Sequence, residues 1–98
     1  MSSYEGMLGL ACRARKVVSG DTLFKAILSN DVYLVIIAED CGNNSRKKLV
    51  NKCDFYKVPY VFVEDSLKLN QAIGGYNVKA VGLKDEGFAR KLHTCLKG

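Results

Sequence analysis

The segment that combines a glycine, small polar residues and a lysine is the clearest candidate for binding chemistry: Ser19, Gly20, Asp21, Thr22 and Lys25. It stands where an apolar helical pattern begins. Glycine permits a positive φ or a close backbone approach, and a helix N-terminus presents unpaired N–H donors and partial positive charge. The lysine adds a full charge one turn further on. The segment could therefore hold a phosphate or a base edge, although a turn and helix cap is the simpler interpretation of a Gly–Asp pair alone.

Two adjacent carboxylates, Glu39 and Asp40, form a second candidate at the end of an apolar run. Such a pair could serve acid–base chemistry or bind a metal. Neighbouring side chains at a strand end point apart, however, and no histidine or third carboxylate lies nearby in the sequence. Hard cations need more oxygen ligands than this. We therefore expect these residues to order the loop rather than to act in catalysis.

No arrangement typical of an enzyme is found in the chain. There is no G-x-S-x-G motif, His93 is the single histidine, and Gly74 and Gly75 end a helical pattern instead of following a strand. The four cysteines show no C-x-x-C spacing, which predicts reduced thiols and no zinc site: Cys12, Cys41, Cys53 and Cys95. We expect no catalytic activity, cofactor, metal or small-molecule substrate, and an enzyme is the weakest of three hypotheses.

The length of 98 residues is enough for one domain, which we place at 1–98. The net charge of +5 favours polyanionic partners, above all nucleic acid, but is equally typical of a small basic protein that is merely soluble. The longest apolar run, 32–38, is too short to span a bilayer, and no basic-then-apolar signal opens the chain. These features predict a soluble, cytoplasmic protein without a membrane partner.

The elements that position these residues alternate along the chain. Short apolar runs at 17–18, 32–38, 60–63 and 78–83 predict strands, and helical patterns precede, separate and follow them. We expect caps at Asp21, at Ser45, at Asp65 or Ser66, and at Asp85. Strands alternating with helices predict an α/β fold. Its form should be a three-layer α/β/α sandwich with a mixed, mainly parallel sheet of about four strands.

A third group of candidates lies on the helix expected after the Glu39–Asp40 loop. Lys48 and Lys52 are four residues apart and share one solvent face, and Lys47 is adjacent. These lysines could form a patch that faces RNA. A solvated helix face explains them about as well.

The order and spacing of several segments resemble the L-seven-Ae family of ribosomal proteins, and within it a small bacterial branch. The resemblance covers nearly the whole chain. It rests on LGLA at 8–11, RARK at 13–16, VSG at 18–20, KAI at 25–27, LVIIAED at 34–40, KC at 52–53, YKVPY at 56–60, AIG at 72–74 and DEGFA at 85–89.

The resemblance implies recognition of kink-turn RNA, a duplex bent sharply at a bulge that is followed by sheared G·A pairs. A regular A-form duplex hides its base edges in a deep, narrow groove, whereas the kink opens that groove to a helix N-terminus. The implied function is that of a non-enzymatic, ribosomal-protein-like module that stabilises the RNA fold. Its partner would be a structured RNA, with ribosomal RNA among the candidates, and the protein would act as a monomer.

The family's pattern assigns roles to particular positions of this sequence. Gly20, Asp21, Thr22 and Lys25, with Ser19 before them, would contact the G·A edges and phosphates. The remaining positions surround that contact: Arg13 and Lys16 on the RNA backbone, Glu39 with the following loop on one flank, and Asn77 and Val78 over the bulged nucleotides.

One departure from the family pattern keeps an alternative open. Gly20 lies one residue closer to Lys25 than is usual, so that Ser19 takes the glycine position and Thr22 the acidic position when the lysine is fixed. A threonine hydroxyl offers a base edge fewer contacts than a carboxylate. The alternative function is a protein-interaction module on the same fold that has lost its RNA specificity.

Overall fold

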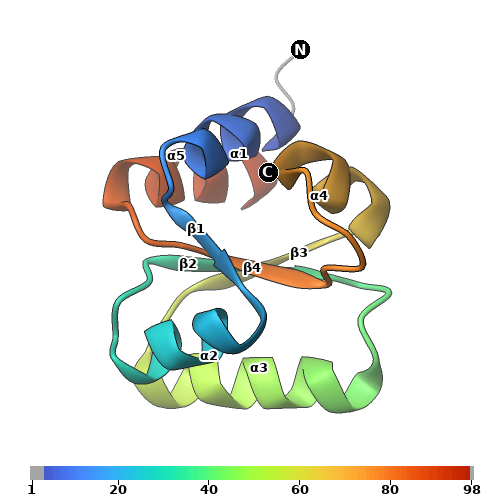
Figure 1. Ribbon diagram of the computed structural model, residues 1–98. Coiled ribbons are helices and arrows are strands. Elements are labelled where there is room, and N and C mark those ends of the chain that lie inside the picture. Colours follow the sequence, from blue (N-terminus) through green and yellow to red (C-terminus); the bar gives the residue numbers. More distant parts are fainter. Residues whose placement is uncertain (1–3, 98) are drawn as a thin grey trace.

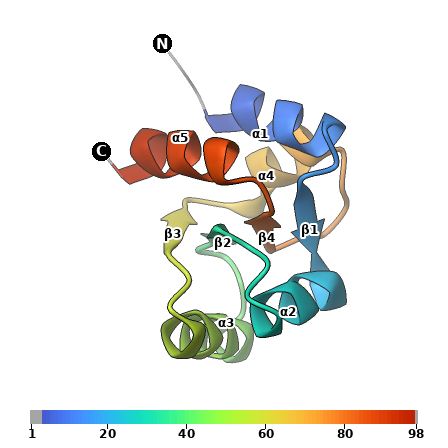
Figure 2. The ribbon, with the colours of Figure 1, turned by 90° about the vertical axis from the view of Figure 1, so that its left-hand side faces the viewer.

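The computed structural model describes residues 4–97, which form helices on both faces of a central sheet (Figures 1 and 2). The elements are, in order, α1 (Tyr4–Arg13), β1 (Val17–Ser19), α2 (Gly20–Leu28), β2 (Leu34–Ala38), α3 (Asn43–Tyr56), β3 (Tyr60–Val63), α4 (Ser66–Ile73), β4 (Ala80–Leu83) and α5 (Glu86–Lys97). Helices α1, α4 and α5 cover one face of the sheet, and α2 and α3 cover the other. The predicted α/β/α sandwich is confirmed.

Strand β2 is buried along its whole length, as its unbroken apolar sequence predicted. Its residues alternate between two cores. Leu34 and Ile36 pack into the core under α1, α4 and α5, whereas Val35 and Ile37 pack into the core under α2 and α3. The strand therefore joins the two helical layers and fixes their positions relative to the sheet.

The sheet is mixed, with strand order β1-β4-β2-β3, and the expectation of a mainly parallel sheet is wrong. Within residues 4–97, only β2 and β3 pair in parallel, while β4 is antiparallel to both β1 and β2. Strands β1, β2 and β3 do run in the same direction, as crossover helices require. The chain enters β4 at the end of the sheet where β3 finishes, so β4 runs opposite to its neighbours β1 and β2. Strand β4 then inserts between β1 and β2.

A close approach between a strand and a helix seats α2 on the sheet. Gly82 in β4 lies beneath Leu23 of α2, and a Cβ at this glycine would lie 2.5 Å from the Leu23 Cδ1 atom and 3.2 Å from Val32 Cγ1. Leu23 is only 1% exposed, so its side chain has little room to move. The missing side chain of Gly82 therefore sets how closely the start of α2 packs against the sheet.

Two of the four expected helix caps are present. Ser45 is not a cap, because α3 begins at Asn43 and Gly42 occupies the N-cap position. Asp65 precedes α4 and accepts hydrogen bonds from the Leu67 and Lys68 amides, and Asp85 accepts one from the Phe88 amide at 2.9 Å. Asp21 is not a cap, because α2 begins one residue earlier than expected and Ser19 occupies the N-cap position. The prediction overlooked that Gly20 itself can enter the helix.

The cysteine side chains are free thiols, and no helix among residues 4–97 is long and apolar enough to cross a membrane. Burial raises the pKa of the Cys53 thiol to about 11, and the nearby Asp54 carboxylate acts in the same direction. This cysteine is a packed part of the core under α2 and α3.

Candidate nucleic-acid interface

Helix α2 begins directly from strand β1, and its first turn is open. Ser19 has extended backbone angles (φ −147°, ψ 170°), and its side chain makes no capping hydrogen bond. Gly20 follows with φ +61°, in the left-handed region that favours glycine. The amides of the first turn therefore remain available to an external acceptor, at the positive end of the helix dipole.

The outer face of α2 carries the remaining polar candidates. Asp21, Thr22 and Lys25 are exposed, while Leu23 and Ile27 are buried against the sheet. The spacing of three and four residues places the first two beside Lys25 on one face of the helix. An ammonium, a hydroxyl and a carboxylate are thus presented together next to the open first turn.

A cleft of about 270 Å³ joins the start of α2 to a distant part of the sequence. Ser19 and Gly20 form one wall, and Asn77 and Val78, in the loop before β4, form another. Strand pairing explains this proximity: Ser19 is in register with Val81, so the chain enters β4 close to where it leaves β1 (Figure 1). Residues of the β2–α3 segment complete the lining: Cys41, Ser45 and Leu49.

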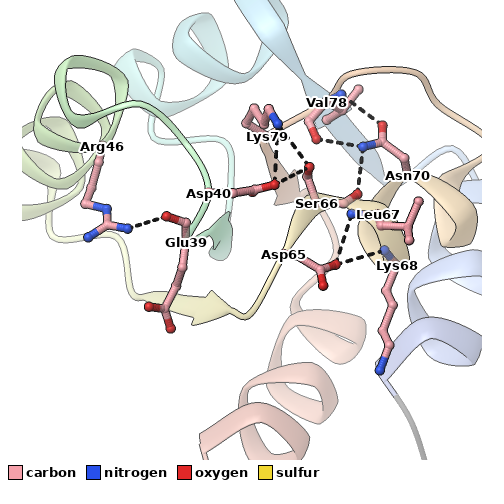
Figure 3. A network of polar contacts seen from close by, with 10 residues as sticks. All are labelled: Glu39, Asp40, Arg46, Asp65, Ser66, Leu67, Lys68, Asn70, Val78 and Lys79. Carbon is pink, nitrogen blue, oxygen red and sulfur yellow. Dashed lines mark hydrogen bonds and ion pairs between the residues drawn. The ribbon is translucent and has the colours of Figure 1, made fainter.

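The loop that carries Asn77 and Val78 is held by one side chain of α4 (Figure 3). Asn70 Nδ2 donates to the Val78 carbonyl oxygen at 2.9 Å, and Asn70 Oδ1 accepts from the Val78 amide at 2.9 Å. The same Nδ2 donates to the Ser66 carbonyl oxygen at 2.7 Å. Asn77 itself has φ +57°, which an asparagine tolerates better than most residues. The position of this cleft wall is therefore fixed by hydrogen bonds to both backbone groups of Val78.

A second polar cluster braces the adjoining segments. The Ser66 hydroxyl donates to Asp40 Oδ2 at 2.9 Å, and Lys79 Nζ lies 3.1 Å from Ser66 Oγ and 3.5 Å from Asp40 Oδ2 (Figure 3). The hydrogen bond from Ser66, with a smaller contribution from the Lys79 charge, lowers the pKa of Asp40 below its ordinary value. These contacts agree with the loop-ordering role expected for Asp40.

Glu39, the other member of the carboxylate pair, lies outside the cleft. Its carboxylate points away from the Asp40 cluster (Figure 3), and its carbonyl oxygen accepts a 2.6 Å hydrogen bond from Arg46 Nη2. The Arg46 guanidinium also lies 5.3 Å from the centre of the Phe62 ring. Glu39 is therefore not among the residues that line the cleft.

Arg13 and Lys16 also lie away from the cleft, at the opposite end of β1. Val17 is in register with Leu83, and the Lys16 carbonyl oxygen accepts from the Lys84 amide at 2.7 Å. Both basic side chains are exposed. The three residues of β1 separate this end of the strand from the start of α2, a distance of about 10 Å.

The sequence alone did not predict three residues that hold the cleft wall and the adjoining loop in place: Ser66 as a buried donor, Asn70 and Lys79. A signal existed for Asn70, since asparagine is unfavourable inside a helix unless its side chain finds partners. Lys79 gave no signal, because only the fold brings it to Asp40. Within residues 4–97, no three His, Cys, Asp or Glu side chains gather in a way that could hold a metal ion.

Comparison with known proteins gives the family. Residues 2–93 match the Ribosomal protein L7Ae/L30e/S12e/Gadd45 family. The chain belongs to this family. RNA-binding protein YlxQ of Bacillus subtilis (strain 168) is 46% identical over 91 residues, covering 92% of this chain and 91% of that protein. RNA-binding protein YlxQ of Enterococcus faecium is 33% identical over 93 residues, covering 94% and 89%.

Two solved structures share this fold. A protein of unknown function from Bacillus halodurans C has a TM-score of 0.94 at 36% identity, with 100% of both chains covered. The Giardia lamblia 15.5kD RNA binding protein shares the fold, with a TM-score of 0.78 at 18% identity over 95% of this chain and 83% of that one. Both curated relatives are described as RNA-binding proteins, in agreement with the expectation of a non-enzymatic RNA-binding module.

Proposed function

We propose that this protein binds structured RNA of the kink-turn type, with the N-terminus of α2 entering the groove that the kink opens. The observation that carries the proposal is the cleft that Ser19 and Gly20 share with Asn77 and Val78. These two segments were assigned to one RNA site from the family resemblance alone. Their proximity in the fold supports a common ligand, and family relatives described as RNA-binding proteins support its being RNA.

In this mechanism each wall of the cleft has a separate task. The open amides after Ser19 donate to base edges or phosphate oxygens, and the absence of a side chain at Gly20 allows the backbone to approach closely. Lys25 neutralises a phosphate and releases its counterions. The loop at Asn77 and Val78 covers nucleotides that the bulge leaves unstacked. The protein acts as a non-catalytic monomer that stabilises the bent form of the RNA.

Electrophoretic mobility shifts with matched RNAs test the proposal. One RNA carries a kink-turn, and its control has the bulge deleted and Watson–Crick pairs in place of the G·A pairs. We expect the protein to prefer the kink-turn, and Lys25→Ala to weaken that complex about tenfold and to lower its salt slope by about one unit. Lys91→Ala, which removes an exposed charge from α5 in the opposite layer, is the matched control.

Three outcomes would contradict the proposal. The first is equal affinity for the two RNAs, and the second is an equal effect of Lys25→Ala and Lys91→Ala. The third is failure of both RNAs to bind, which would favour a protein-interaction module on this fold.

A further inference from the structure

Helix α3 carries a row of exposed side chains on its outer surface. Lys48, Lys52 and Phe55 recur at spacings of four and three residues, which places them on one face of the helix. The buried residues of α3, Leu49 and Cys53, point toward the sheet. Phe55 is 77% exposed, an unusual position for a large apolar ring. We call Lys48, Lys52 and Phe55 the α3 row.

Among residues 4–97, the two lysines of the α3 row form no ion pair with an acidic side chain. The ion pairs formed within residues 4–97 are those of Lys79, Lys84 and Arg90. Asp54 is the acidic residue of α3, and at two positions after Lys52 it projects from a different side of the helix. The row therefore presents uncompensated positive charge beside an exposed aromatic ring.

The surface around the α3 row is hollowed. Lys48, Lys52 and Phe55 line a depression of about 650 Å³ together with Asn51 and Tyr56. The Phe55 and Tyr56 rings meet edge to face, with centroids 4.9 Å apart. Because Tyr56 is partly buried in the core, this contact steadies the exposed ring.

The α3 row also leads away from the proposed RNA cleft. Ser45, in the first turn of α3, lines that cleft with Ser19 and Gly20. Lys48 follows about 4.5 Å further along the helix axis, and Phe55 about 15 Å further. Helices α2 and α3 lie in the same layer (Figures 1 and 2). An RNA strand that leaves the cleft can therefore continue over the face of α3 that carries the row.

We propose that the α3 row binds a single-stranded RNA segment that continues from the kink. Lys48 and Lys52 contact its phosphates, and Phe55 stacks on one unpaired base. A duplex offers no exposed base face for the ring, and an apolar protein partner would leave the lysines without anions. This inference rests on the proposed function for the source of the strand, although the row can be tested without it.

The test compares a kink-turn RNA with the same RNA extended by a six-nucleotide single-stranded tail, placed in turn at each end of the kinked strand. We expect one tail to strengthen binding to the unchanged protein about tenfold. Phe55→Ala should abolish this gain without altering affinity for the tail-less RNA, and Phe55→Tyr should keep it. Leu67→Ala, at a 65% exposed apolar residue of α4, is the matched control and should also keep it.

A separate measurement distinguishes failure of this inference from failure of the kink-turn proposal. Binding of a twelve-nucleotide polyuridine, followed by fluorescence anisotropy, should weaken in Phe55→Ala and in Lys52→Gln even if no kink-turn binds. The inference is overturned if neither tail adds affinity, if the gain survives Phe55→Ala, or if sedimentation shows a dimer of the unchanged protein that Phe55→Ala dissociates.

Discussion

The two ends of strand β1 present different surfaces to a ligand. At the cleft end, Gly20 faces a loop whose Val78 backbone is fixed through two hydrogen bonds by Asn70. At the other end, Arg13 and Lys16 are exposed cations for which the structure gives no side-chain hydrogen bond or ion pair within residues 4–97. One end is shaped by polar contacts, and the other offers exposed positive charge.

This difference separates two contributions to RNA binding. Contacts to phosphates supply affinity that depends on salt and not on sequence or shape, and flexible lysines and arginines are sufficient for them. Recognition of a kinked groove requires donors and apolar surface at fixed positions. We therefore expect changes at the cleft end to alter specificity, and changes at the basic end to alter affinity for all RNAs alike.

Among the variants that test the difference between the two ends of β1, Asn70→Ala should have the largest effect. It leaves the amide and carbonyl groups of Val78 without their partners, and we expect it to lower the free energy of unfolding by about 2 kcal/mol. The cleft wall should loosen, so that affinity for the kink-turn falls while affinity for a plain duplex does not. Urea denaturation and gel shifts measure the two effects, with Gln71→Ala at the exposed neighbouring position as control. Equal stability and RNA affinity of Asn70→Ala and Gln71→Ala would show that Asn70 does not hold the cleft wall in place.

Lys16→Ala should have a smaller effect, on affinity for all RNAs and not on specificity. Loss of one exposed cation should weaken kink-turn and plain duplex by the same factor, about threefold at low salt, and lower the salt slope by about one unit for both. Titrations at several salt concentrations measure both slopes. A selective loss of kink-turn binding would place Lys16 in the specific interface and contradict the division between the two ends.

Ser66→Ala should have the smallest effect, confined to the cleft end. Because the Ser66 hydroxyl is the main cause of the lowered pKa of Asp40, its removal should raise that pKa toward the ordinary value of 3.8. A lowered carboxyl pKa contributes stability that is present above pH 3.8 and is lost as the pH falls through the lowered value. Carboxyl NMR titration measures the pKa, and Ser45→Ala is the control. An unchanged Asp40 pKa would show that the Ser66 hydrogen bond does not hold this loop.

Much of the fold could be predicted because apolar patterning specifies which segments are buried. The unbroken run ending at Ala38 indicated a strand covered on both faces, and β2 is such a strand. The position of β4 could not be predicted, because strand order depends on contacts between residues distant in sequence. Its start was also expected too early: the Val78 amide bonds to the Asn70 side chain, and the strand begins at Ala80.

The candidate site was predictable in part for a similar reason. Gly20 and Lys25 stand out locally, as a glycine at a helix start and a cation on its outer face. The brace on Val78 involves a side chain eight positions earlier in the chain, and Lys79 and Asp40 are 39 positions apart. Such contacts become visible only when the strands are placed.

Amide NMR shifts of the protein during titration with a kink-turn RNA would locate the bound surface. We expect the largest shifts at 19–25 and 75–79, the two segments that meet at the cleft, with weaker changes near Arg13 and Lys16. Shifts centred on α5, or equal shifts with a plain duplex, would contradict this expectation.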